Sequence, residues 1–152
     1  MQPRLNHWAA APDLMQAFLA LNTAIESAGL EKSLMHLVKL RASQINGCAF
    51  CVDMHTREAR KDGESEQRLY LTSAWHDSFL YSERERLALG WTEALTRLGA
   101  ETPDDARYEA MKAQFSEQEL IQLTAVITMI NTWNRLSIAF RAVHAGADAA
   151  AA

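Results

Sequence analysis

Hydrophobic residues recur three and four positions apart along most of the chain, which is the spacing of one face of an α-helix. Start and stop signals divide this pattern into about seven helices. We predict helices over residues 13–29, 31–45, 48–63, 65–76, 82–99 and 116–143, with another that begins at Thr102-Pro103. Two of these begin with a capping box, in which Ser82 is followed by Glu85 and Ser116 by Glu119. The pattern therefore predicts an all-helical chain.

The first and last predicted helices differ in how they distribute apolar residues. Asp13 is expected to cap the first helix, which carries Leu14, Phe18, Leu21 and Ile25 at helical spacing. The last helix has two apolar stripes, one of Leu120, Leu123, Ile127, Ile130 and Ile138 and another of Val126, Met129, Trp133 and Phe140. A helix that is apolar on two sides is buried on two sides. We expect it to lie in the core or at a subunit interface.

Composition supports an all-α fold in one domain. The 152 residues are 49% hydrophobic and 22% charged, which is typical of a globular protein. Alanine (26) and leucine (18) far outnumber valine (4) and isoleucine (6), so helix formers dominate over β-branched strand formers. We predict one helical domain over residues 1–144 and an alanine-rich, frayed tail over 145–152.

Charge and hydropathy exclude several partners. The formal net charge is −4. Domains that bind the phosphate backbone of nucleic acids are usually basic, so we expect no nucleic-acid partner. No apolar run approaches the length of about 18 residues that a membrane span needs, so we expect no membrane partner. Residues 1–20 lack the apolar region of a signal peptide. A cytoplasmic location is the resulting expectation.

The chain contains two cysteines, Cys48 and Cys51, and they lie in the motif C-x-x-C-x-x-x-H with His55. In a reducing compartment such a close pair is typically catalytic, redox-active or metal-binding. On a helix that starts after Asn46-Gly47, the dipole favours a thiolate in the first turn. His55 shares a face with Cys51, four residues away, and can take its proton.

Two other interpretations of the pair remain open. Free cysteines are often buried and inert, so the pair could be a core feature. A structural zinc site needs four ligands, and Cys48, Cys51 and His55 supply three, with another histidine completing the set. A thioredoxin-type site would follow a β-strand, and none is predicted before Cys48. We favour an activated dithiol and expect neither a metal nor an organic cofactor.

At this motif the sequence resembles a known family, the alkylhydroperoxidase D-like branch of the carboxymuconolactone decarboxylase family. The residues that carry the resemblance are Leu37–Cys51, Met54-His55-Thr56, Ala59-Arg60, Glu83–Arg86 with Trp91 and Glu93, and Asn131–Arg135. The resemblance implies an all-helical fold assembled as a homotrimer or homohexamer. It also implies a peroxidase that reduces alkyl or hydrogen peroxides by cycling between a dithiol and a disulfide, with electrons from a separate dithiol reductant.

The chain departs from the family pattern at two places. The best-known members carry a carboxylate twelve residues before the first motif cysteine, where this chain has His36, and a histidine between the cysteines, where it has Ala49 and Phe50. The dithiol and His55 are intact. The decarboxylases of the wider family generally lack the cysteine pair, so the resemblance favours a peroxidase over a decarboxylase.

We therefore predict a site in which Cys51 attacks peroxide, Cys48 resolves the product as a disulfide, and His55 is the general base. A positioned base outweighs the helix dipole, and the resemblance also implies that the second cysteine attacks. His36 is either an outer member of the proton relay or a surface residue near Lys39. A non-catalytic redox sensor and a metal-binding helical module are the alternative functions.

Several residues outside the motif carry further expectations. Arg41 lies in an apolar stripe, so it should form an ion pair, within the chain or at a subunit contact. Glu93 is either a relocated relay carboxylate or, more commonly for glutamate, an exposed one. Asn131 and Asn134 fall in the apolar face of the last helix and should form a structural hydrogen-bond network rather than contact substrate. Core or interface positions are expected for Trp75, Trp91 and Trp133.

Overall fold

The computed structural model describes residues 2–100 and 102–144, and every regular element in these ranges is a helix. The elements are α1 (His7–Ala10), α2 (Pro12–Glu26), α3 (Lys32–Asn46), α4 (Ala49–Lys61), α5 (Glu66–Leu71), the 3-10 helix η1 (Thr72–Asp77), α6 (Glu83–Thr96), α7 (Asp105–Gln114) and α8 (Glu117–Phe140). The predicted all-α class is thus confirmed. The predicted tail over 145–152 lies outside the described residues.

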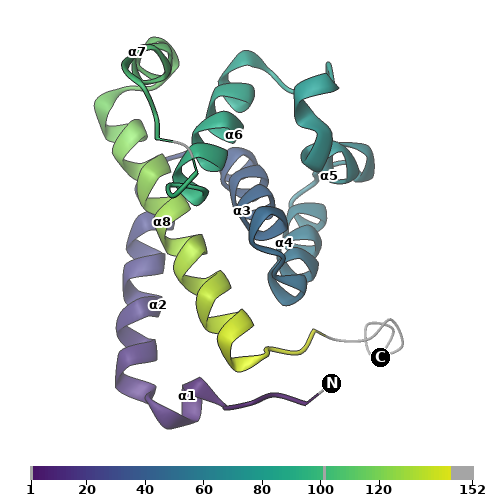
Figure 1. The fold of residues 1–152 in the computed structure, drawn as a ribbon, viewed down its shortest axis with the longest axis vertical. Helices are drawn as coiled ribbons and strands as arrows, with labels where there is room; N and C mark the ends of the chain where they lie inside the picture. The colour runs from purple at the N-terminus through teal and green to yellow at the C-terminus, as the bar shows by residue number, and fades with distance from the viewer. Residues whose placement is uncertain (1, 101, 145–152) are drawn as a thin grey trace.

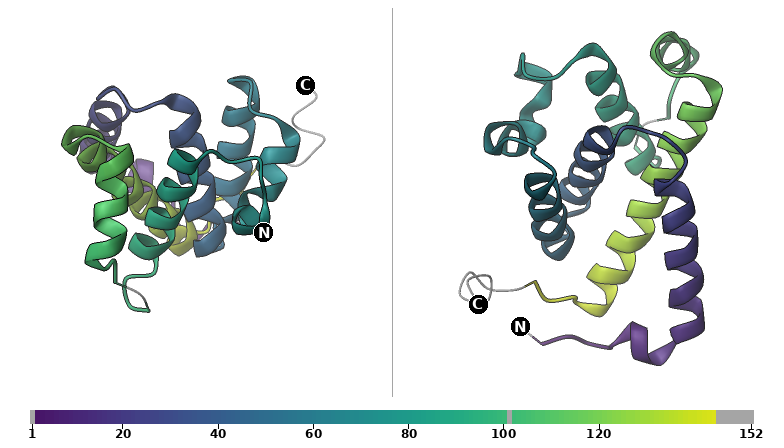
Figure 2. Two further views of the ribbon diagram at one scale, coloured as in Figure 1. Left: turned by 90° about the horizontal axis from the view of Figure 1, so that it is seen from above. Right: turned by 180° about the vertical axis from the view of Figure 1, so that it is seen from behind.

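Helices α3 and α8 form the centre of the fold, and the other helices surround them (Figures 1 and 2). In α3 almost every side chain from Leu34 to Ser43 is buried, because α4, α6 and α8 all pack against it. The largest cluster joins α3, α6, α7 and α8, with Leu34, Val38, Trp91, Met111, Phe115, Leu123 and Ile127 among its members. Helix α4 packs along α3, and the cysteines lie where α3 ends and α4 begins.

Helix α8 has the two-sided burial that its sequence predicts. The capping box of Ser116 and Glu119 is present at its start, as is the box of Ser82 and Glu85 at the start of α6. Apolar residues of α8 enter the core with α3, α6 and α7, and its other side faces α2 (Figure 1). Other helices of the same chain therefore bury both sides of α8. Ile138, near its end, is nevertheless 47% exposed.

The N-terminal region differs from the prediction. A short helix, α1, precedes α2 and is capped by Asn6. α2 begins at Pro12, so Asp13 occupies the first turn instead of the cap. Leu14 and Leu21, two of its apolar residues at helical spacing, are 55% and 53% exposed. The reason is that α2 packs on one side, mainly against α8 and α1, and no other element of the described residues covers its outer face.

Two further boundaries were predicted incorrectly. The helix predicted over 65–76 is divided into α5 and η1, with a non-helical backbone at Ala74. The helix predicted to start at Thr102-Pro103 is capped instead by Asp104, whose carboxylate accepts a hydrogen bond from the Arg107 backbone N–H. Aspartate is a favoured N-cap residue, so the Asp104 cap is a local signal that the prediction assigned to Thr102 instead.

The two ends of the described chain lie near each other (Figure 1). The backbone N–H of Arg4 donates to the carbonyl of Phe140 at 3.0 Å, and its guanidinium donates to the carbonyl of Ala139.

Across residues 2–100 and 102–144, none of the helices is both long enough and apolar enough to span a bilayer.

Candidate active site

The cysteine pair lies at the tight turn between α3 and α4. Gly47 ends α3 in the left-handed conformation, with φ of 69°, which a glycine adopts without steric cost. The Cys48 N–H then donates to the carbonyl of Ser43 at 3.0 Å. Cys48 is the N-cap of α4 and not part of its first turn as predicted, while Cys51 is the third residue of the helix.

Cys48 and Cys51 form a disulfide in the structure, with their Cα atoms 5.3 Å apart. The Cys48 sulfur also accepts a hydrogen bond from the Cys51 backbone N–H at 3.3 Å, as an N-cap side chain does. Both residues are at most 2% exposed. The unpaired N–H groups and the positive end of the α4 dipole lie at this pair, and they stabilise negative charge on sulfur when the disulfide is open.

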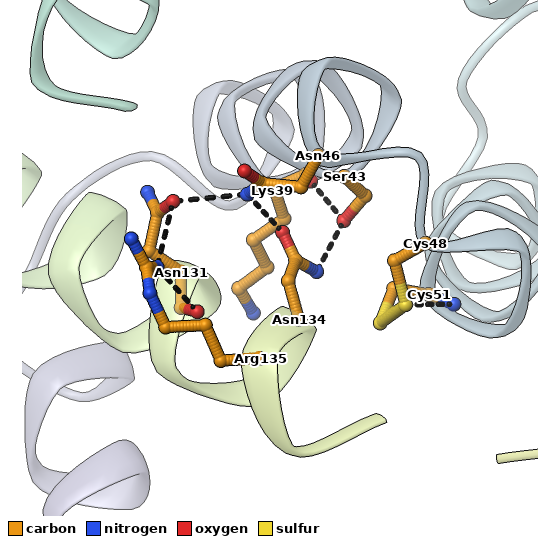
Figure 3. The surroundings of a disulfide bond; sticks show 8 residues. All are labelled: Lys39, Ser43, Asn46, Cys48, Cys51, Asn131, Asn134 and Arg135. Atoms are coloured by element: carbon orange, nitrogen blue, oxygen red, sulfur yellow. Dashed lines mark hydrogen bonds between the residues drawn. A yellow bond between two sulfur atoms is a disulfide. The ribbon is translucent and has the colours of Figure 1, made fainter. Parts of the chain in front are cut away.

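A network of buried amides holds the same turn from the side of α8 (Figure 3). The Asn46 side-chain amide donates to the side-chain oxygens of Asn131 and Asn134, at 2.9 and 2.8 Å. Asn134 in turn donates to the Ser43 hydroxyl at 3.1 Å. Since the Ser43 carbonyl receives the Cys48 N–H, the network fixes the backbone that carries the first cysteine. The predicted structural role of Asn131 and Asn134 is confirmed.

Asn134→Ala should lower the free energy of unfolding by about 1–3 kcal/mol, because it leaves the buried Ser43 hydroxyl and the half-buried Asn46 amide without this partner. Urea denaturation followed by circular dichroism measures the change. Gln118→Ala, at an exposed position of the same helix, is the matched control and should change stability by less than about 0.5 kcal/mol. Equal effects of the two substitutions would contradict the structural role of the network.

His55 is held by a carboxylate one turn further along α4. Its Nδ1 is 2.8 Å from Glu58 Oε2, and the hydrogen bond from His55 is the main reason why the pKa of Glu58 lies below its usual value. An ionised carboxylate only accepts hydrogen bonds, so Nδ1 carries the proton. Nε2 then presents a lone pair. It is buried and, within the described chain, has no hydrogen-bond partner.

His36 forms a second pair of the same kind. Its Nε2 is 2.7 Å from Asp62 Oδ2, and Lys32 Nζ is 2.8 Å from the same oxygen. Hydrogen bonds from Lys32 and His36 lower the pKa of Asp62. His36 is only 5% exposed, so the surface interpretation of this residue was wrong. α4 covers it, because the α3–α4 turn folds the second helix back along the first.

Glu58 and Asp62 were not predicted as site residues. A usable signal was present, since the two carboxylates lie three and seven residues after His55 and therefore share its helical face. Spacing within α4 could have paired Glu58 with His55. The contact of Asp62 with His36 joins residues 26 positions apart and depends on how α3 and α4 pack.

A cavity of about 850 Å³ lies between α2, α3, α4 and α8. Cys51, His55 and His36 all line it, together with Glu58 and Asp62. Cys48 is not among the described residues that line it. The structure therefore brings three of the four predicted site residues to one cavity and places the fourth in a disulfide with one of them.

The part of the cavity lining that α8 contributes is largely apolar and aromatic. Val126, Met129 and Trp133, which form most of the second stripe of α8, line it. The Trp133 ring stacks on Trp8 with centroids 5.9 Å apart, and its indole N–H donates to Asn22 at 3.1 Å. The cavity therefore combines this apolar surface with the polar groups of α3 and α4.

Arg41 and Glu93 form a separate polar cluster. Arg41 forms the expected ion pair, with Glu93 at 2.8 Å, and the pair lies within one chain. Glu93 also accepts the Trp75 indole N–H at 2.8 Å. Burial alone would raise the pKa of Glu93, but hydrogen bonds from Trp75 and Arg41 outweigh it and lower the pKa. Glu93 is thus not an exposed residue, and it is absent from the described lining of the cysteine cavity.

The remaining predicted aromatics follow the expectation in part. Trp75 and Trp91 are buried, at 5% and 8% exposure, and Trp133 lies in the cavity wall.

Among the residues for which positions are described, no three His, Cys, Asp or Glu side chains are arranged to hold a metal ion.

Residues 12–94 match the model of the carboxymuconolactone decarboxylase family, and the chain belongs to that family. An uncharacterized protein of Bacillus subtilis, YdfG, is 37% identical over 139 residues, which cover 91% of this chain and 95% of the relative. Within the family, the chain fits the alkylhydroperoxidase D-like branch that its motif indicates.

A solved structure supports this placement, and a more distant one shares the fold. A protein of unknown function from Agrobacterium tumefaciens, for which an AhpD-type antioxidant defence role has been suggested, is 46% identical, with a TM-score of 0.93 over 95% of this chain and 99% of its own. The debrominase Bmp8 shares the fold at 23% identity, with a TM-score of 0.82 over 93% of this chain and 76% of its own.

Proposed function

We propose that this protein is a thiol-dependent peroxidase that reduces alkyl or hydrogen peroxides through Cys51 and Cys48. One observation carries the proposal. Cys51 lines the same cavity as His55, and Glu58 holds His55 with its Nε2 lone pair free. A nucleophile and a base that a third group orients are the arrangement that activates a thiol.

The first step begins from the reduced dithiol. His55 Nε2 takes the proton of Cys51, and Glu58 stabilises the imidazolium that forms. The thiolate then attacks one oxygen of the peroxide. A sulfur–oxygen bond forms, the oxygen–oxygen bond breaks, and the electron pair goes to the leaving oxygen, which is protonated to an alcohol or water. Cys51 becomes a sulfenic acid.

The second step closes the disulfide seen in the structure. The Cys48 sulfur attacks the Cys51 sulfenic acid, and water leaves. A dithiol reductant then returns both cysteines to thiols by exchange and is itself oxidised to a disulfide. Supply of such a reductant is a property of reducing compartments, which is consistent with a cytoplasmic protein.

A coupled assay tests the function. Purified protein should consume alkyl hydroperoxide over many turnovers when dithiothreitol is the electron donor, and a metal analysis of the same sample should find less than one zinc per chain. Stoichiometric oxidation without turnover would identify a redox sensor. Bound zinc together with thiols that resist titration would identify a metal-binding module. Either result would overturn the proposal.

Free thiols should fall by two per chain when the reduced protein meets mild peroxide, and dithiothreitol should restore them. The pair is 5.3 Å apart between Cα atoms and buried within one chain, so the bond forms internally. Titration of thiols together with non-reducing electrophoresis checks this. The appearance of disulfide-linked dimers would count against an internal disulfide.

We also propose that the chain assembles with copies of itself, as a homotrimer or homohexamer. Leu14 and Leu21 are seven residues apart on one face of α2, and both are more than half exposed. An apolar strip of this kind on a helix is typical of a surface that another subunit covers. The family resemblance implies the same two assembly states.

Light scattering should give a mass three or six times the 17.0 kDa of the chain. Leu14→Glu combined with Leu21→Glu should shift the protein toward smaller species, since two charges would be buried at the interface. Leu98→Glu, at an exposed leucine outside α2, is the control and should keep the assembly. A mass near that of one chain at micromolar concentration would rule out the assembly.

A further inference from the structure

The cavity that contains Cys51 is much larger than hydrogen peroxide requires. Its volume is about 850 Å³. One water molecule takes up about 30 Å³ in the liquid, and hydrogen peroxide has only one more oxygen atom than water. Cavities of about 300–1,000 Å³ are typical of sites that hold organic ligands of the size of a drug. The volume therefore indicates a substrate in which the peroxide is attached to a large group.

The cavity extends along the whole length of α4. Residues of one helical face, three or four positions apart, line it in turn, and they are Cys51, Met54, Glu58 and Lys61. Cys51 is the third residue of α4 and Lys61 is the last. Since an α-helix rises by about 1.5 Å per residue, these two positions are roughly 15 Å apart along the helix axis. A substrate that reaches from Cys51 to the far end of the cavity has to be long.

The interior of the cavity is lined by apolar side chains between these two ends. Its buried and half-buried apolar members include Leu30, Met35, Met54, Val126, Met129 and Ile130. Three of them are methionines, one each from α3, α4 and α8. Methionine is flexible and polarizable, so it adapts to apolar groups of irregular shape. This surface is suited to a flexible hydrocarbon chain.

The far end of the cavity is positively charged. Lys32 Nζ is 2.8 Å from Asp62 Oδ2, which brings the start of α3 to the end of α4. Lys61, the neighbour of Asp62, is exposed and forms no ion pair with the residues that the structure describes. Two lysines and one carboxylate leave a net positive charge there. Lys39, the other lysine of the lining, is already paired with Glu26. An anionic group is therefore attracted to the end that Lys61 marks.

We propose that the substrates of this site are long-chain hydroperoxides that carry a carboxylate, such as fatty acid hydroperoxides, with the chain on the apolar lining and the carboxylate at Lys61. The inference rests on the proposed peroxidase function and names its substrate class. The chemistry at sulfur is that described above. The fatty acid hydroperoxide is reduced to the hydroxy fatty acid, the dithiol of Cys48 and Cys51 is oxidised to the disulfide, and one water molecule is released.

Three oxidants that differ in chain and charge test the substrate class. Each rate of oxidation of the reduced protein is divided by the rate of the same oxidant with free dithiothreitol, which removes differences in intrinsic reactivity. On this scale linoleic acid hydroperoxide should react about tenfold faster than tert-butyl hydroperoxide or more, because each methylene group removed from water strengthens binding by up to about fourfold. Methyl linoleate hydroperoxide, which keeps the chain and lacks the charge, should lie between them. Stopped-flow tryptophan fluorescence follows the oxidation, and equal scaled rates for all three would overturn the substrate class.

Reversing the charge of Lys61 tests where the carboxylate lies. Lys61→Glu should slow the reaction with linoleic acid hydroperoxide about fivefold, because it places a like charge beside the carboxylate. The rates with the methyl ester and with tert-butyl hydroperoxide should stay within about twofold. Lys112→Glu is the matched control, since Lys112 is an exposed lysine of α7 outside the described lining of the cavity, and it should change none of the rates. Equal slowing of all three oxidants by Lys61→Glu, or slowing of none, would overturn the carboxylate site.

A binding measurement without peroxide separates the substrate class from the peroxidase function. The oxidised protein should bind oleate, one molecule per chain, and octanoate should bind more weakly because its chain is shorter. Lys61→Glu should weaken oleate binding about fivefold, whereas Lys112→Glu should not. Isothermal titration calorimetry below the micelle concentration gives both affinity and stoichiometry. Saturable oleate binding without reaction with any of the three oxidants would support the ligand class and overturn the peroxidase function. Absence of saturable oleate binding would overturn the substrate class even in an active peroxidase.

Discussion

Replacing Cys51 with serine is expected to abolish the rapid reaction of the protein with one equivalent of alkyl hydroperoxide, whereas Cys48→Ser should retain it. Both cysteines lie at the N-terminus of α4, so the dipole, worth roughly 0.3–1 kcal/mol at an exposed site, distinguishes them little. A positioned base contributes about 10²–10⁴-fold in rate. His55 shares a helical face with Cys51, and Cys51 is the cysteine at the cavity.

The Cys48→Ser variant provides the direct readout. Without its resolving partner, Cys51 should accumulate as a sulfenic acid, which dimedone labels and mass spectrometry locates. Cys51→Ser should leave Cys48 slow to oxidise, because Cys48 is buried and outside the described cavity lining. Sulfenic acid on Cys48 of the Cys51→Ser variant, formed at the wild-type rate, would reverse the two roles.

His55→Ala is expected to slow the first oxidation step at least a hundredfold, because it removes the base that takes the Cys51 proton. Reduction of the disulfide by dithiothreitol should change much less, since that step begins from sulfur atoms that carry no proton. Glu58→Gln should have a smaller effect, because it removes the charge that stabilises the imidazolium but keeps an oxygen acceptor for Nδ1. Single-turnover rates with and without the reductant separate the two steps.

His76→Ala is the control for loss of a histidine. The His76 side chain is 65% exposed and contacts Glu93, which is not among the described lining residues of the cysteine cavity. Its replacement should leave both steps unchanged. Equal slowing of oxidation and reduction in His55→Ala would mean that the residue supports the fold of α4 and is not the base. Partial rescue of His55→Ala by added imidazole would support the proposed role.

The local features of this protein could be predicted from its sequence. The helical class follows from composition and from apolar spacing within each segment. The capping boxes at Ser82 and Ser116 depend on residues three apart, and both are present. Cys48, Cys51 and His55 are also close in the sequence and lie at the N-terminal end of one helix. The sequence could therefore locate the candidate site and the turn before it.

Features that join distant segments could not be predicted in this way. His36 was equally consistent with a surface and a site position, because the side of α3 that α4 covers depends on how the two helices pack. Arg41 binds the carboxylate of Glu93, which lies 52 residues further along the chain. The exposure of the outer face of α2 likewise depends on which helices pack against it.

The sequence by itself therefore determined the helices, their caps and the cysteine–histidine motif, since these depend on residues a few positions apart. The tertiary structure alone decided that Cys51, His55 and His36 line one cavity, that Asp62 completes the second histidine–carboxylate pair, and that the amides of α8 hold the turn before Cys48. These contacts form only when helices far apart in the sequence bury their apolar faces against one another, which fixes the polar groups beside those faces.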